Sequence, residues 1–208
     1  MRISELAAIS GTPVATIKYY VREGLLAGGE RLGENRTEYT DEHAHRLRLI
    51  RSLLEVGKLS ISSATAVLAT LDDPSLPIAE TFDVAQRALT RDAVSAVSDP
   101  TPESLARVDS LVESVGWRKC QGNVGRDIVA QVMDAFNRVG YPLKDEYFRS
   151  YAQAAEIAAG ADLSEVGAIP DPADRTELMV VGTILGDSLA LGLRRIAQAH
   201  MTAERGLR

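Results

Sequence analysis

A short basic and hydroxylated stretch near the start of the chain carries side chains suited to contact nucleic acid. In the segment GTPVATIKYYVREGLL, residues 11–26, the apolar residues Val14, Ile17 and Val21 recur at helical spacing and predict one buried face. The other faces then present Thr16, Lys18, Tyr19 and Arg22. Lysine and arginine neutralise phosphates, and threonine and tyrosine hydroxyls hydrogen-bond to phosphate oxygens or base edges. The pattern therefore predicts a helix that binds DNA.

The residues before this helix predict how it begins. Thr12 followed by Pro13 is typical of a helix start, because the hydroxyl can accept a hydrogen bond from a free amide and proline there loses no helical hydrogen bond. Upstream, residues 3–9 carry apolar side chains at helical spacing, and Ser10-Gly11 supplies a tight turn. Two short helices joined in this way form a helix-turn-helix, whose second helix enters the major groove.

At these residues the chain resembles the MerR family of transcription regulators. The segment ISELA, residues 3–7, is similar to that family's opening helix, and TIKYY at 16–20 with EGLL at 23–26 is similar to its recognition helix and exit. Lys18 stands where arginine is more usual, which keeps the charge but gives up a planar fork of donors. Tyr20 lies three residues after Ile17, so its ring could pack in the core instead of contacting DNA. The candidate DNA contacts in this segment are Thr12, Thr16, Lys18, Tyr19, Tyr20 and Arg22.

A polar, glycine-rich passage follows over residues 27–39. Arg31-Leu32 and Thr37-Glu38-Tyr39 are expected to pair as strands around residues 33–35, which gives a small hairpin or wing. In the resembled family this wing contacts the backbone beside the groove. The resemblance therefore makes Arg31 and Arg36 candidate phosphate ligands.

Two more helices complete the front of the chain. Thr40 followed by two acidic residues opens the first, which breaks at residues 56–59, and Ser60 opens the second, which runs to Leu71. Two prolines and two acids at residues 72–77 mark a boundary. We therefore predict a winged helix-turn-helix DNA-binding domain at 1–73 and a helical effector-binding and dimerisation domain at 74–208.

Beyond residue 77 the readable patterns are helical. Helices are expected from Ile78 to before residue 98, over 101–116 and 123–139, over about 144–159, and from after Pro172 to about His200. No internal repeat is present, and no alternating pattern beyond the wing is long enough for a sheet. The predicted fold is mainly α, with the small hairpin of the wing in front of an all-helical C-terminal domain.

Charge and cysteine content limit the function classes. The net charge is −6 at pH 7, yet the first 71 residues carry 9 basic against 8 acidic side chains and the remainder carries 14 against 21. DNA binding must therefore depend on how the basic groups are placed, and on two copies acting together. Cys120 is the single thiol, which excludes an intrachain disulfide and a multi-thiolate metal site. We expect a cytoplasmic protein with no membrane span, no metal, no cofactor and no catalytic site.

The aromatic residues of the rear region are concentrated in one third of its length. Aromatic walls with a few polar tips can bind a small organic effector, and the same rings can equally form the core of a helical domain. The candidate effector-binding residues are Trp117, Phe136, Tyr141, Tyr147, Phe148 and Tyr151.

The resemblance also implies partners and a mode of action. It implies a homodimer on an inverted repeat in double-stranded DNA, within a promoter that the protein distorts until RNA polymerase can use it. The dimer could be built from residues 78–97, from the last helix, whose Gly182, Gly186 and Gly192 would allow close approach, or from both. Two alternatives stay open: a ligand-sequestering protein that keeps a MerR-like domain, and an architectural DNA-binding protein without an effector.

Overall fold

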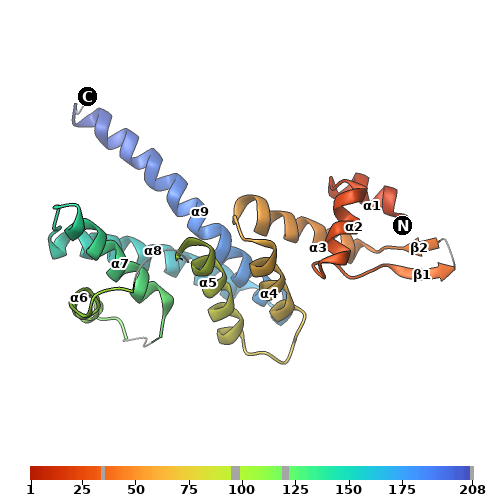
Figure 1. The fold of residues 1–208 in the computed structure, drawn as a ribbon, viewed down its shortest axis with the longest axis horizontal. Helices are drawn as coiled ribbons and strands as arrows, with labels where there is room; N and C mark the ends of the chain where they lie inside the picture. The colour runs from red at the N-terminus through yellow and green to blue at the C-terminus, as the bar shows by residue number, and fades with distance from the viewer. Residues whose placement is uncertain (34–35, 95–98, 119–121, 207–208) are drawn as a thin grey trace. The chain divides into compact units, whose positions relative to one another are not determined.

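The computed structural model describes residues 1–33, 36–94, 99–118 and 122–206, and it is mainly helical, as predicted (Figure 1). The elements are α1 (Ile3–Ser10), α2 (Val14–Arg22), β1 (Glu30–Gly33), β2 (Arg36–Glu38), α3 (Asp41–Arg51), a π-helical turn (Ser52–Val56), α4 (Ile61–Leu71), α5 (Ile78–Val94), α6 (Pro102–Ser114), α7 (Val124–Arg138), α8 (Asp145–Ala168) and α9 (Pro172–Glu204). The chain divides into unit 1, which contains Met1–Leu89 and Thr176–Arg208, and unit 2, which contains Thr90–Arg175.

The helix-turn-helix lies at the front of unit 1. Gly11 ends α1 with φ +64°, a left-handed conformation that glycine adopts without a steric cost. The chain then reverses into α2. Helix α1 contacts both α2 and α3, and all three helices contribute to one core of buried side chains. That core includes Leu6, Ile17, Leu25, Leu47, Ile50 and Leu53.

The predicted caps of the next two helices are present. Thr40 opens α3 in a capping box whose third helical residue is His43, and His43 Nδ1 accepts a hydrogen bond from the Thr40 amide at 3.1 Å. Ser60 opens α4, and its Oγ accepts a hydrogen bond from the Ser63 amide at 3.2 Å. Between these helices the chain makes one π-helical turn at Ser52–Val56, and Lys58 adopts φ +58°. The predicted break is confirmed: the π-helical turn ends at Val56, and α4 begins only at Ile61.

The predicted wing is a two-stranded antiparallel hairpin. Arg31 pairs with Thr37, and a register shift separates Arg31 from Gly33. The hairpin projects away from α1, α2 and α3 (Figure 1).

The last helix returns to unit 1 and completes its core. Val180 and Ile184 of α9 are fully buried there, together with Ala85 of α5. Two polar contacts join α9 to the front of the unit: His45 Nε2 lies 2.7 Å from Glu177 Oε1, and Ser188 Oγ donates to the Val56 carbonyl at 3.0 Å. The compact units therefore group α9 with the helix-turn-helix, whereas the division predicted at residue 73 separates them. The effector and dimerisation roles assigned to residues 74–208 stay predictions.

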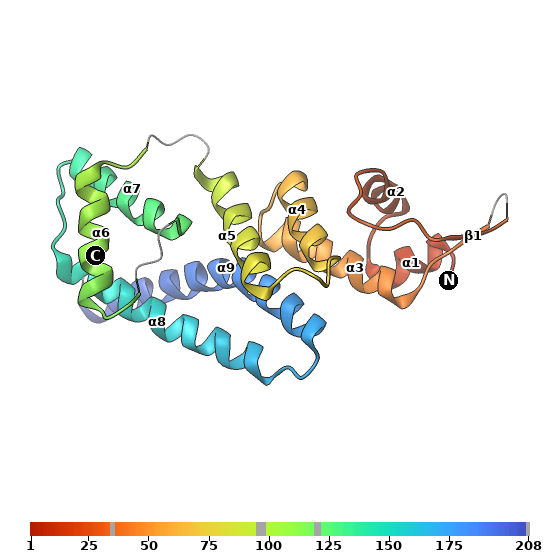
Figure 2. The same ribbon diagram turned by 90° about the horizontal axis from the view of Figure 1, so that it is seen from below.

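Unit 2 contains α6, α7 and α8 (Figure 2). Its small core contains Val108, Ala130, Met133 and Phe148. Thr101 caps α6 and Asn123 caps α7 through their side chains. The helix predicted to end near residue 159 instead continues to Ala168. A single glycine, Gly160, costs only about 1 kcal/mol in a helix interior, so this alanine-rich helix continues until it nears Pro170.

Candidate DNA-binding interface

The recognition helix α2 separates its side chains into a buried and an exposed face. Ile17 and Tyr20 are buried in the core of unit 1, while Lys18 and Arg22 are exposed and Thr16 and Tyr19 are half-buried. The exposed face thus carries two positive charges, and the half-buried residues place two hydroxyls beside them. This arrangement can neutralise phosphates and reach base edges in a major groove.

Thr12 is not part of that face. Its side chain is only 2% exposed, its amide donates to the Ala7 carbonyl at 3.2 Å, and α2 begins after it, with Pro13 at the cap position. The amide also lies 3.3 Å from Ser10 Oγ. The predicted capping role of Thr12 is therefore wrong, and the burial of this residue argues against its predicted DNA contact.

Tyr20 also faces inward. It is 8% exposed and belongs to the core of unit 1. Burial is the main cause that raises the pKa of its phenol, and the nearby Glu55 carboxylate raises it further. This burial favours core packing over the predicted DNA contact of Tyr20, the alternative that its position three residues after Ile17 already allowed.

Tyr19 and Arg22 act as a pair on the exposed face. The Arg22 guanidinium carbon lies 5.2 Å from the centre of the Tyr19 ring, within range of a cation–π interaction. The Arg22 side chain is 72% exposed, and its ion pair with Glu23 is long at 3.5 Å. The ring therefore supports the guanidinium while leaving its donors available to a ligand.

We expect Tyr19→Phe to weaken operator binding by about two- to tenfold, the range for loss of one hydrogen bond. Phenylalanine keeps the ring under Arg22 and removes only the hydroxyl, so the fold should be unchanged. Gel-shift titration measures the effect, and Tyr141→Phe, at an exposed tyrosine of unit 2, is the matched control. Equal affinities for the Tyr19→Phe variant and the unmodified protein would remove the hydroxyl from the interface.

The wing holds the two remaining candidate contacts. Arg31 is exposed on β1, as a phosphate ligand must be. Arg36 belongs to β2, where it pairs with Gly33, but its side chain lies outside the described part of the chain. Gly29 directly precedes β1 and lies close to the backbone of β2. A Cβ at this position would collide with the Glu38 carbonyl, which explains a glycine at the base of the wing.

Sequence reasoning missed a positioning role for Arg46 of α3. Its Nε donates to the Leu25 carbonyl at 3.2 Å, directly after the recognition helix, and its Nη2 donates to the Leu68 carbonyl at 3.4 Å. The same Nη2 lies 2.6 Å from Asp72 Oδ2. Arg46 therefore ties the exit of α2 to the end of α4. An arginine among the buried positions of α3 was the available signal, but its partners are more than 20 residues away.

The aromatic residues of unit 2 are only partly brought together. Tyr147 lies between Phe148, at 5.3 Å between ring centres, and Tyr151, at 4.9 Å, and its ring also meets Phe136 at 6.1 Å. Phe148 is buried beneath the Arg107 guanidinium, whereas Tyr147 and Tyr151 are exposed. These contacts do not include the exposed Trp117 and Tyr141. The effector role of the six rings stays a prediction.

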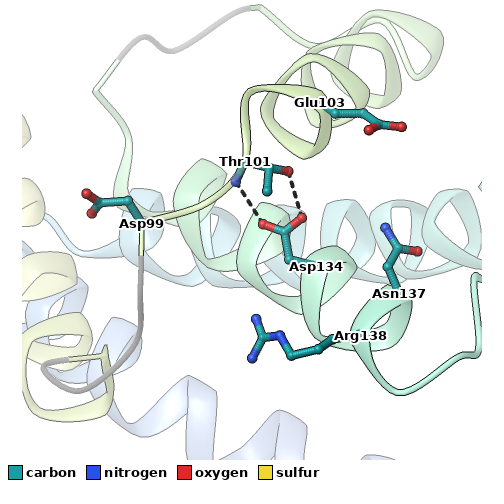
Figure 3. Close-up of a pocket in the computed structure, with 6 residues that line it drawn as sticks. All are labelled: Asp99, Thr101, Glu103, Asp134, Asn137 and Arg138. Carbon is teal, nitrogen blue, oxygen red and sulfur yellow. Dashed lines mark hydrogen bonds between the residues drawn. The ribbon is translucent and has the colours of Figure 1, made fainter.

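A hollow of about 400 Å³ in unit 2 is polar rather than aromatic (Figure 3). Its lining consists of Asp99, Thr101, Glu103, Asp134, Asn137 and Arg138. The Asp134 carboxylate accepts hydrogen bonds from the Thr101 amide at 2.8 Å, from Thr101 Oγ1 at 2.7 Å and from Ser104 Oγ at 2.6 Å. Asp134 of α7 therefore caps the start of α6, which is a structural role.

We expect Asp134→Ala to lower the melting temperature more than Asp99→Ala, which removes a carboxylate from the same hollow. The three hydrogen bonds hold the pKa of Asp134 below its usual value. Its stabilising effect is therefore present above the ordinary aspartate pKa of about 3.9 and is lost as the pH falls through the lowered folded-state pKa. Thermal unfolding at neutral pH and in acid measures this, and a difference between the variants that persisted at the lowest pH would contradict it.

Outside the gaps at 34–35, 95–98, 119–121 and 207–208, no group of three or more His, Cys, Asp or Glu could hold a metal ion. Cys120 lies outside the described residues. By length and composition alone α9 could cross a membrane, but Val180 and Ile184 in its first half pack in the core of unit 1.

Comparison with known proteins supports the reading of the front domain. Residues 1–71 match the family described as MerR HTH family regulatory protein. The chain is 33% identical over 90 residues to the HTH-type transcriptional regulator HmrR of Rhizobium leguminosarum bv. viciae, an alignment that covers 43% of this chain and 68% of that protein.

Among solved structures, a candidate transcriptional regulator, SCO5550 of Streptomyces coelicolor A3(2), superposes with a TM-score of 0.71 at 29% identity. That match covers 99% of this chain and 97% of the other, so the likeness extends through both units. With an exposed basic face on α2, a hairpin wing beside it and these relatives, the chain belongs to the MerR family of helix-turn-helix transcriptional regulators.

Proposed function

We propose that this regulator binds an inverted repeat in promoter DNA as a homodimer and that a small organic effector controls its activity. The observation that carries the DNA part is the exposed face of α2, where Lys18 and Arg22 stand opposite the buried Ile17. In each protomer α2 would enter a major groove, and Arg31 of the wing would contact flanking phosphates. The near-neutral charge of the first 71 residues favours two copies acting together.

The proposed mode of action is distortion of the promoter. Contacts made by two recognition helices and two wings would offset the free energy of bending or untwisting the duplex between them. RNA polymerase could then engage promoter elements that are poorly aligned in straight DNA. We place this activity in the cytoplasm, where the single thiol would stay reduced.

The DNA part is tested with the full chain and the DNA upstream of its own coding sequence. Gel-shift titration at physiological salt should give a specific complex containing two protomers, and sedimentation should give a dimer. Footprinting should show two protected half-sites related by a two-fold axis. Equal affinity for unrelated duplexes of the same length would contradict sequence-specific regulation.

The effector part is tested in unit 2. Trp117 is the single tryptophan and is partly exposed, so its fluorescence reports ligand binding to this unit. A regulator requires that a ligand bind one conformational state more tightly and thereby change DNA affinity or transcription. A ligand that binds and leaves DNA affinity and transcription unchanged would favour a sequestering protein. The burial of Phe148 beneath Arg107 favours the second candidate, an architectural DNA-binding protein without an effector.

A further inference from the structure

An arginine of α3 reaches across to the turn of the helix-turn-helix. Arg51 Nη1 donates to the carbonyl oxygens of Ser10 and Gly11, at 3.3 Å each. Carbonyls at the end of a helix lack intrahelical donors and carry partial negative charge, so a guanidinium there is favourable. A Cβ on Gly11 would lie 3.2 Å from the same Nη1, which shows how closely the guanidinium packs on the turn.

Glu55 fixes the orientation of this guanidinium. Arg51 Nε lies 2.8 Å from Glu55 Oε1, and Arg51 Nη2 lies 3.1 Å from Glu55 Oε2, a two-pronged pairing. Because Nε and Nη2 are paired with Glu55, Nη1 is the nitrogen that donates to the carbonyls of the turn. Arginine has the planar fork for both tasks at once, and lysine does not.

The charges of this ion pair also act on a buried residue of the recognition helix, although burial is the main cause of the raised pKa of Tyr20. The charges of Glu55 and Arg51 both shift the pKa of the buried Tyr20 phenol, Glu55 upward and Arg51 downward. The pair thus faces the turn that starts α2 and a core residue within α2. It is anchored on the last residue of α3 and on the π-helical turn that follows.

We propose that Arg51, oriented by Glu55, is a positioning residue for DNA recognition that sets the direction in which α2 leaves the turn. The inference rests on the proposed function, because it matters only if α2 meets DNA. It does not require Arg51 to touch DNA. A small rotation of α2 would displace Lys18 and Arg22, four and eight residues beyond its first residue, from the groups they contact.

The experiment compares Arg51→Met, Arg51→Lys and Glu55→Gln of the full chain, using duplexes that the unmodified protein selects from a random pool and an unrelated duplex. Arg51→Met should lose about tenfold or more in affinity for the selected duplex, the cost of misaligning one base contact. Its affinity for the unrelated duplex and the slope of log affinity against log salt should be unchanged. A direct phosphate contact would instead weaken both duplexes and lower that slope by about one. Arg51→Lys keeps the charge but not the fork, and should resemble Arg51→Met.

Glu55→Gln separates positioning from electrostatics by the sign of its effect. Removing an acid from a DNA-binding domain should strengthen binding if charge alone matters. Positioning predicts weaker binding to the selected duplex. The matched controls are Arg126→Met and Asp109→Asn, which break a two-pronged ion pair in unit 2, and neither should change DNA affinity.

Hydrogen exchange without DNA provides a separate measure. Amides of residues 11–17 should exchange faster in Arg51→Met than in the unmodified protein. If the unmodified protein selects no duplex, the proposed function fails, while exchange still tests whether Arg51 holds the turn. Unchanged exchange, unchanged affinity of Arg51→Met for the selected duplex, or tighter binding by Glu55→Gln would each overturn the inference.

Discussion

Replacing Lys18 and Arg22 together by alanine should lower affinity for the operator by about a hundredfold or more, since each well-made base contact contributes about 1–3 kcal/mol. Both side chains are exposed on the outer face of α2, and Arg22 is supported by the Tyr19 ring. Neither is part of the core, so the double variant should keep the melting temperature and oligomeric state of the unmodified protein. Gel-shift or fluorescence-anisotropy titration at fixed salt measures the loss.

The matched control for this double variant removes two positive charges elsewhere. Lys144 and Arg149 are exposed in unit 2, at and near the start of α8. Replacing both by alanine changes the net charge by the same amount and should leave operator affinity almost unchanged. If both double variants lost affinity equally, the effect would come from overall charge, and α2 would lose its role as the reading helix.

Substituting Gly57 by alanine should destabilise the whole of unit 1 and loosen α9. A Cβ at Gly57 would collide with Ile184 of α9 and would lie 2.7 Å from the Leu53 carbonyl oxygen, which belongs to the backbone and cannot move aside cheaply. Overpacking of this kind costs about 1–3 kcal/mol. The melting temperature should therefore fall by about 2–10 °C for a chain of this size. The hydrogen bond from Ser188 to Val56 should be lost with it.

The control is a glycine of α9 itself, Gly186. A Cβ at Gly186 has nothing within 4 Å, so Gly186→Ala should be neutral or stabilise the protein by up to about 1 kcal/mol. Hydrogen exchange along residues 176–188 should accelerate in Gly57→Ala and stay slow in Gly186→Ala. Equal melting temperatures for the two variants would mean that α9 does not pack on the π-helical turn in solution. Loss of the dimer in Gly186→Ala alone would instead place that glycine at the contact between protomers.

These two predictions test different parts of unit 1. The first concerns the face that reads DNA, and the second concerns the helix that closes the core behind it. Unit 2 is continuous in sequence between α5 and α9, and parts of both helices are buried in unit 1.

Local sequence determined the features that depend on neighbours along the chain. The spacing of Val14, Ile17 and Val21 predicted which way α2 faces. Ile17 is buried and the two valines are half-buried, while Lys18 and Arg22 are exposed. Thr40 and Ser60 predicted helix starts because a cap involves residues only three positions away. The wing was predictable for the same reason, since β1 and β2 are separated by two residues.

Tertiary structure alone decided the contacts between residues distant in the chain. Thr12 carries a hydroxyl that could cap a helix or bind DNA, yet the turn buries it. Arg51, 40 residues away in the chain, donates a hydrogen bond to the Gly11 carbonyl of that turn. The joining of α9 to the π-helical turn links Ser188 to Val56, 132 residues apart. Helical periodicity predicts that one face of a helix is apolar, but not which segment covers that face. Burial depends on matching shape and volume between segments that are distant in the chain, and periodicity carries no information on how those segments pack together.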